Sequence, residues 1–120
     1  CRAVIPASYQ EFLNITLRYV DTDKQSILAY APVPRIAAVM SFSQEMTQRA
    51  EADMNRMTEA LIEGIIGIGG TYYLPYRPHA TIDQISRAYP RLSEFVQSKR
   101  EIDPKLNFRN ALWDKYMKRV

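Results

Sequence analysis

The sequence predicts an α+β domain, in which an antiparallel sheet with helices on one face is followed by a helical C-terminal tail. Three observations lead to this fold class. Residues 15–20 alternate polar and apolar side chains with a period of two, which is typical of a strand with one wet face. Residues 46–65 carry apolar side chains at helical spacing. From residue 81 onward, capping and breaking signals favour helices.

The N-terminal part is expected to supply the other strands. Residues 2–5 are predicted to form a strand, and Pro6 suits the first turn of a short helix over residues 7–13. A further short strand is predicted at residues 27–31. Residues 36–42 lack proline and carry few charges, so we expect them to form a central strand.

The clearest predicted element is a long amphipathic helix that Gly69 and Gly70 bring to an end. Residues 71–74 are then expected to form a strand. The apolar stripe of the helix recurs at steps of three and four residues and consists of Met46, Ala50, Met54, Met57, Leu61 and Ile65.

Helices are predicted for the remainder of the chain. Thr81 and Gln84 have the spacing of a capping box, in which each side chain satisfies a free backbone N–H of the other residue. Pro90 is expected to start a second helix through Arg100, and Asn107 to cap a last helix through Lys118. The chain is therefore divided into residues 1–80, with the sheet and long helix, and residues 81–120, with the helical segment.

Composition excludes several classes of protein. The 120 residues are 47% hydrophobic and 24% charged with a net charge of +3, which fits one globular unit. One cysteine and one histidine exclude a thiolate-built zinc site and a His-rich metal centre, so no metal is expected. The longest apolar run, residues 65–70, is far shorter than the roughly 20 residues of a membrane-spanning helix.

Positive charge is concentrated near the C-terminus. Residues 87–120 hold nine Lys and Arg and four Asp and Glu, a net charge of +5, which leaves −2 for residues 1–86. Such a tail can contact nucleic acid or an anionic membrane surface. Because the basic residues are spread among Leu92, Phe95 and Trp113 rather than clustered, we interpret them as a solvated helix face and expect no nucleic-acid partner.

The segment with the most chemistry is Tyr72-Tyr73-Leu74-Pro75-Tyr76-Arg77-Pro78-His79. It places three tyrosines, an arginine and the only histidine between a predicted strand and a predicted helix, where loops often carry function. Tyrosine and histidine can donate hydrogen bonds or move protons, and arginine can hold an anion or a sugar oxygen. The structural alternative is that the tyrosines pack on the sheet and His79 lies near a helix start.

Residues 69–113 contain an ordered set of motifs. They are Gly69-Gly70-Thr71-Tyr72-Tyr73-Leu74, His79-Ala80-Thr81, Ala88-Tyr89-Pro90, Phe95, Lys99-Arg100, Asp103-Pro104 and Phe108-Arg109-Asn110. This set resembles the C-terminal part of FAD-linked oxidases of the vanillyl-alcohol-oxidase type. Within these, it is similar to D-arabinono-1,4-lactone oxidase and its relatives and to decaprenylphosphoryl-ribose oxidase. Residues 1–68 fit more loosely, as part of a ferredoxin-like cap domain.

The resemblance implies a role for four residues. His79 is expected to be catalytic and Asn110 to bind the cofactor, while Tyr73 and Arg77 are expected to bind the substrate. The structural alternatives are that Asn110 caps the last helix and that Tyr73 belongs to the core. Lactone oxidases follow the histidine with Trp-Gly-Lys, whereas this chain has Ala80-Thr81-Ile82 and so lacks the catalytic lysine of that motif.

The resemblance also implies that the chain is a fragment of an enzyme that oxidises an alcohol carbon of a sugar, sugar lactone or alditol, with hydride transfer to FAD. FAD would be held mainly by a flavin-binding domain of the same polypeptide, and the isolated fragment, inactive by itself, could dimerise. The start at Cys1 agrees with an excised piece, and a lipid-bearing N-terminal cysteine is the alternative. We expect a cytoplasmic or membrane-associated location. The rival hypothesis is a stand-alone α+β binding module with a basic helical tail.

Overall fold

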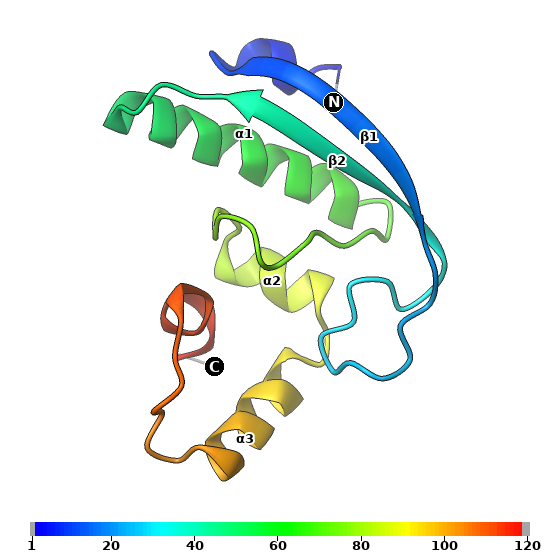
Figure 1. Ribbon diagram of the computed structural model, residues 1–120, viewed down its shortest axis with the longest axis vertical. Helices are drawn as coiled ribbons and strands as arrows, with labels where there is room; N and C mark the ends of the chain where they lie inside the picture. Colours follow the sequence, from blue (N-terminus) through cyan, green and yellow to red (C-terminus); the bar gives the residue numbers. More distant parts are fainter. Residues whose placement is uncertain (1, 119–120) are drawn as a thin grey trace.

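The computed structural model describes residues 2–118 and confirms the α+β class. A strand hairpin lies at one end of the molecule, α1 runs alongside it, and α2, α3 and the C-terminal helical turn lie on the other side of α1 (Figure 1). In chain order the elements are η1 (Ile5–Ala7), β1 (Glu11–Val20), β2 (Arg35–Ser43), α1 (Gln48–Ile66), α2 (Ile82–Ala88), α3 (Leu92–Ile102) and the π-helical η2 (Trp113–Met117).

The sheet is a single antiparallel pair, β1 with β2. The register runs from Glu11 opposite Ser43 to Val20 opposite Arg35, with a bulge between Phe12 and Asn14. Because residues directly opposite each other share a face, the register separates the side chains into two sets. One face is wholly apolar and consists of Phe12, Ile15, Leu17, Tyr19, Ile36, Ala38, Met40 and Phe42.

Several predicted strands are wrong within the described residues, because segments 2–5, 27–31 and 71–74 do not form strands. Residues 21–34 instead make a loop that closes on itself, with Asp23 N donating to Ala31 O at 2.8 Å. The Asp23 carboxylate also accepts from the N–H groups of Gln25 and Ser26. Thr71 Oγ1 donates to Tyr30 O at 2.5 Å, so a side chain, not a strand ladder, ties the segment after α1 to this loop.

The short helix predicted over residues 7–13 is also wrong. Only the 3₁₀ turn Ile5–Ala7 is helical, and residues 11–13 already belong to β1. Phe12 packs edge-on against Phe42 across the strand pair, with ring centroids 5.5 Å apart. Cross-strand pairing therefore overrides the local helical pattern.

The long helix is confirmed as α1, and its start is explained by a cap. Thr47 is extended, and its Oγ1 accepts from Ala50 N at 3.1 Å, which satisfies one free N–H of the first turn. Met54, Met57 and Ile62 of the predicted helix are buried. At the other end, Gly70 N donates to Ile65 O at 2.8 Å, and Gly69 adopts a positive φ of 74°.

The C-terminal tail is helical with different boundaries. The capping box between Thr81 and Gln84 is confirmed at the start of α2. The helix predicted from Pro90 begins at Leu92. The last helix, predicted from Asn107, begins later, because Asn110 Oδ1 accepts from Trp113 N at 2.9 Å and Asn110 acts as the cap in its place.

The main core lies among the helices rather than under the sheet. Ile62 of α1 joins residues of α2, α3 and η2, among them Ile85, Val96 and Tyr116, which are no more than 2% exposed. The core thus fixes the irregular segment 71–80, which runs between α1 and α2. No helix within residues 2–118 is long and apolar enough to cross a membrane.

Candidate functional site

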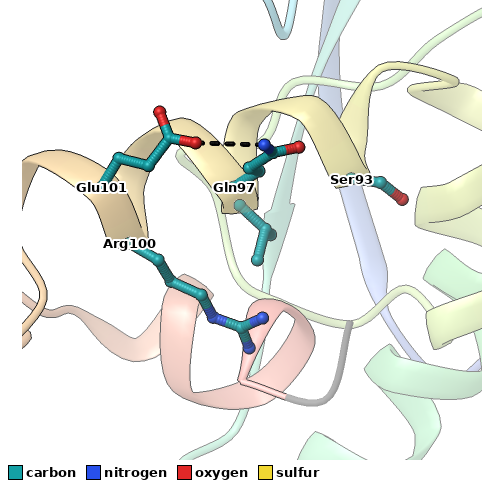
Figure 2. Close-up of a pocket in the computed structure, with 5 residues that line it drawn as sticks. Ser93, Gln97, Arg100 and Glu101 are labelled. Carbon is teal, nitrogen blue, oxygen red and sulfur yellow. Dashed lines mark hydrogen bonds between the residues drawn. The ribbon is translucent and has the colours of Figure 1, made fainter.

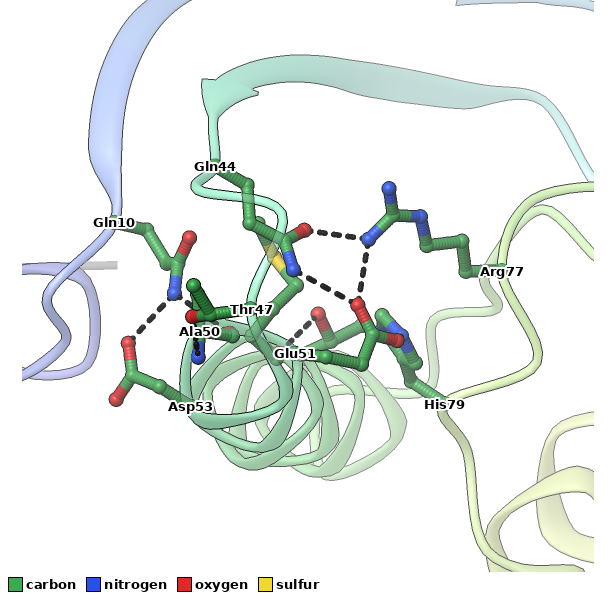
Figure 3. Close-up of polar contacts among 10 residues, drawn as sticks. Gln10, Gln44, Thr47, Ala50, Glu51, Asp53, Arg77 and His79 are labelled. Carbon is green, nitrogen blue, oxygen red and sulfur yellow. Dashed lines mark hydrogen bonds and ion pairs between the residues drawn. The ribbon is translucent and has the colours of Figure 1, made fainter.

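A carboxylate in the first turn of α1 gathers three side chains from other parts of the chain (Figure 3). His79 Nε2 is 2.9 Å from Glu51 Oε1. Arg77 Nη1 donates to Glu51 Oε2 at 2.8 Å, and Gln44 Nε2 donates to the same oxygen at 2.9 Å. Arg77 Nη1 also donates to Gln44 Oε1 at 2.5 Å. We call Gln44, Glu51, Arg77 and His79 the Glu51 cluster.

The backbone around His79 is held from two sides. His79 N donates to Arg77 O at 2.8 Å, which forms a tight turn within the segment. From η2, Tyr116 donates its hydroxyl to Ala80 O at 2.8 Å, and Lys115 donates its ammonium group to Pro78 O. The histidine is therefore positioned by α1 through its side chain and by η2 through its neighbouring carbonyls.

Burial differs sharply within the Glu51 cluster. The His79 side chain is 8% exposed, whereas the side chains of Glu51 and Arg77 are 50% and 55% exposed. Hydrogen bonds from Gln44 and His79 lower the pKa of Glu51, and the positive charge of Arg77 acts in the same direction against the opposing effect of burial. Glu51 is thus a carboxylate that accepts hydrogen bonds at both oxygens.

The protonation of His79 follows from its partner. An ionised carboxylate only accepts, so Nε2 of His79 must donate to Glu51. In the neutral ring the other nitrogen, Nδ1, is then the acceptor, and it can take up a proton. This is the arrangement of a general base oriented by a carboxylate.

Tyr73 lies in a separate aromatic group. Its ring centroid is 5.4 Å from that of Tyr30 and 5.0 Å from that of Tyr76, both in edge-to-face geometry. Tyr73 and Tyr76 are 45% and 63% exposed. Tyr73 makes no hydrogen bond to the Glu51 cluster within residues 2–118, although its segment leads directly into Arg77 and His79.

Asn110 is exposed and caps the start of the last helical segment, which is the structural alternative given for it in the sequence analysis. Its Oδ1 accepts from Trp113 N, and its O accepts from Asp114 N at 3.0 Å, so it caps the turn that leads into η2. Its side-chain NH₂ group makes no hydrogen bond in the described part of the chain. Arg77 and His79 are brought together, whereas Asn110 is not part of the same cluster.

Two open grooves lie on the described residues, and the second includes Ala80, the chain neighbour of His79. One runs along α3 and is lined by Ser93, Val96, Gln97, Arg100 and Glu101 (Figure 2). The other lies between α2 and η2 and is lined by Glu59, Ala80, Thr81, Ile82, Asp114 and Lys115. Neither groove includes a sequence-predicted site residue. Residues 2–118 also contain no group of three His, Cys, Asp or Glu side chains placed to hold a metal ion.

Four of the eight basic residues that the structure describes in the tail form ion pairs. Arg87 binds Glu63 through two nitrogens at 2.6 and 2.9 Å, and hydrogen bonds from Arg87 and Gln84 lower the pKa of Glu63 to about 2. Arg91 pairs with Glu94, Lys99 with Asp103, and Arg109 with Asp114. These pairs balance part of the positive charge of the tail.

Sequence reasoning missed Glu51 and Gln44. Glu51 is part of the polar face of α1, where it resembles any solvated carboxylate, and Gln44 belongs to the turn before the helix. No local motif connects either of them with residue 79.

No protein-family model, curated protein or solved structure matches this chain. The contacts around Glu51 and the sequence motifs of residues 69–113 therefore carry the functional inference.

Proposed function

We propose that this chain is the C-terminal part of an FAD-dependent oxidoreductase that oxidises an alcohol carbon of a sugar, sugar lactone or alditol. The observation that carries the proposal is the contact between His79 and Glu51, at 2.9 Å, beside Arg77. These residues combine a histidine oriented by a carboxylate with an exposed guanidinium group. Oxidation of an alcohol requires both functions, one to remove the hydroxyl proton and one to hold the substrate.

His79 would act as the general base. Its Nε2 is committed to Glu51, so Nδ1 would accept the proton of the substrate hydroxyl. Glu51 keeps the ring oriented, and a base of this kind contributes typically about 10²–10⁴-fold to a rate. Bound FAD would supply the acceptor for the hydride that leaves the same carbon.

Arg77 and Tyr73 would bind the substrate. Within the described residues, only Nη1 of Arg77 is bonded, which leaves the N–H groups on Nε and Nη2 for a substrate oxygen. The half-exposed rings of Tyr73 and Tyr76 offer hydroxyl groups and apolar faces next to it in the chain. Polar groups that fix orientation beside aromatic surface are typical of small-molecule sites.

The described residues fit a contribution to an FAD site rather than a complete one. Neither of the two grooves described above is lined by His79, and the flavin would be held mainly by another domain of the same polypeptide. The unbonded NH₂ group of Asn110 is the donor that this chain would direct toward the cofactor. The proposed partners of this chain are therefore the flavin-binding domain of the same polypeptide and the small-molecule alcohol substrate.

The test uses the natural gene product that contains this chain, purified without truncation. We expect a flavin absorption spectrum and oxidation of sugar lactones or alditols. His79→Gln should lower kcat by about 10²–10⁴-fold while the flavin content stays unchanged. Gln97→Glu, on the exposed face of α3, serves as a control that should keep full activity. A colourless product, or a His79→Gln variant with unchanged kcat, would contradict the proposal.

A further inference from the structure

We propose that β1 pairs antiparallel with β1 of a second copy of this chain, which gives a symmetric dimer with a continuous four-stranded sheet. This inference concerns the hairpin alone and does not depend on the chemistry of the Glu51 cluster. Its basis is the unpaired edge of β1. This strand carries a glutamate near one end and an arginine near the other, so two antiparallel copies place opposite charges side by side.

The outer edge of β1 has no strand partner. The sheet contains only β1 and β2 within the described part of the chain, and β1 forms the outer side of the hairpin (Figure 1). A two-stranded hairpin is marginally stable by itself. Natural edge strands are commonly protected by lysine, proline or a bulge, and the ten residues of β1 include one bulge but neither lysine nor proline. The unpaired backbone groups of β1 are thus available for another strand.

The bulge in β1 determines which registers keep the two faces of the sheet separate. Leu13 is the extra residue between Phe12 and Asn14, and Glu11 and Arg18 lie on the same face, opposite Ser43 and Ala37. When Leu13 and Asn14 are counted as the bulged pair against Thr16, one symmetric antiparallel register places Glu11 opposite Arg18 of the second copy. In this register Phe12 lies opposite Leu17, and Ile15 opposite Ile15.

The charges of β1 favour this register. Glu11 and Arg18 are exposed, and neither takes part in an ion pair within residues 2–118. They lie near opposite ends of the strand, so antiparallel pairing brings each beside the opposite charge of the partner copy. The two-fold axis generates this ion pair twice. A second copy therefore always has the matching charges at the right positions, because the two strands are identical and related by the two-fold axis. An unrelated strand would not in general have them.

Apolar side chains on the other face add to the contact. Leu17 is 67% exposed and Phe12 is 40% exposed, and the register places them against each other across the new strand pair. Cross-strand aromatic–aliphatic pairs stabilise sheets, and like charges directly opposite each other destabilise them. The proposed register contains two such apolar pairs and no pair of like charges.

The experiment measures the mass of the 120-residue chain in solution by sedimentation equilibrium over a range of concentrations. We expect a reversible monomer–dimer equilibrium. Glu11→Lys and Arg18→Glu should each raise the dissociation constant at least about tenfold, because each replaces two attractive contacts by two repulsive ones. Glu45→Lys makes the same charge change as Glu11→Lys at an exposed position outside β1, and should leave the dimer unchanged.

The register is tested by mixing the two singly substituted proteins. The lysine introduced by Glu11→Lys then faces the glutamate introduced by Arg18→Glu, and the unchanged Arg18 of the first chain faces the unchanged Glu11 of the second. A heterodimer should therefore form although neither variant dimerises well alone. Circular dichroism checks that each variant is folded.

Three outcomes overturn the proposal. The first is a wild-type chain that stays monomeric at all concentrations. The second is a dimer that neither charge reversal weakens, and the third is a mixture of the two variants that forms no heterodimer.

Discussion

Glu51 and His79 lie 28 positions apart in the sequence, and Nε2 of His79 is 2.9 Å from Oε1 of Glu51. The contact joins the first turn of α1 to the irregular segment before α2. Arg77 binds the other oxygen of the same carboxylate. One side chain therefore fixes both polar residues of the segment, and changing it should affect stability and the histidine together.

Glu51→Gln is expected to remove a pH-dependent part of the stability. The pKa of Glu51 is lowered from its ordinary value of 4.5, chiefly by the Gln44 and His79 hydrogen bonds. A carboxyl group with a lowered pKa in the folded state stabilises that state above pH 4.5, and this stabilisation is lost as the pH falls through the folded-state pKa. Urea unfolding at neutral pH and at successively lower pH gives the decrease in the free energy of unfolding on acidification. This decrease, called the acid loss below, should be smaller for Glu51→Gln than for the wild type.

Glu45→Gln is the control for this measurement, since Glu45 is an exposed carboxylate that makes no ion pair in the described residues. Its acid loss should equal that of the wild type. In the same samples, the ¹⁵N chemical shifts of the His79 ring report which nitrogen carries the proton. If Glu51→Gln leaves both the ring shifts and the acid loss unchanged, Glu51 does not orient His79.

Two buried tyrosine hydroxyl groups should respond in opposite ways to their removal. Tyr116 is 1% exposed and donates to Ala80 O at 2.8 Å, so Tyr116→Phe leaves a buried carbonyl unsatisfied. We expect it to lower the free energy of unfolding by about 1–3 kcal/mol. The Tyr72 hydroxyl is buried without a hydrogen-bond partner in the described residues. Tyr72→Phe should therefore be neutral or raise the free energy of unfolding by up to about 1 kcal/mol.

Chemical denaturation of both variants under identical conditions provides the comparison, because each removes the same single oxygen atom. The difference between the two changes in the free energy of unfolding reports the contribution of the Tyr116 hydrogen bond, because the change in side-chain volume is the same in both variants. Equal losses for the two variants would mean that the Tyr116 contact with Ala80 adds nothing beyond packing.

The helices α1, α2 and α3 were predictable because their signals are local. The capping box of Thr81 and Gln84 spans four residues, and the apolar stripe that predicts α1 includes its buried Met54 and Met57. Strand pairing joins distant residues, and prediction was less complete there. The strands predicted at residues 15–20 and 36–42 are confirmed within β1 and β2, whereas those at 2–5, 27–31 and 71–74 are wrong. Nothing near Phe12 shows that it pairs with Phe42, and the loop of residues 21–34 closes through the Asp23 side chain and backbone bonds.

The same distinction explains the candidate site. Arg77 and His79 could be identified because they share one short segment between regular elements, whereas Glu51 contributes from a helix that is remote in sequence. Asn110 shows a subtler limit. Two asparagines precede η2 within a few residues of each other, and only the structure shows that Asn110, not Asn107, accepts from Trp113 N. Local composition could not choose between them.

Alanine at two glycines near the end of α1 should have opposite effects on stability. Gly64 is an exposed helical position, and no atom lies within 4 Å of a Cβ added there. Gly64→Ala should therefore raise the free energy of unfolding by about 0.5–1 kcal/mol through the lower entropy of the unfolded chain. At Gly70 an added Cβ would overlap Ile65 Cγ2 and lie 2.9 Å from Ile65 O. Gly70→Ala should lower the free energy of unfolding by about 1–3 kcal/mol.

The Gly70 contact matters beyond stability, because this turn directs the chain from α1 toward the Glu51 cluster. Gly70 N donates to Ile65 O at 2.8 Å, and a backbone displaced by the added methyl group would weaken this bond. Amide hydrogen exchange should then be faster at residue 70 in Gly70→Ala and unchanged there in Gly64→Ala. A stable Gly70→Ala variant with wild-type exchange would show that Ile65 yields to the added methyl group at little cost, and that the tight approach of Gly70 to Ile65 does not define the end of α1.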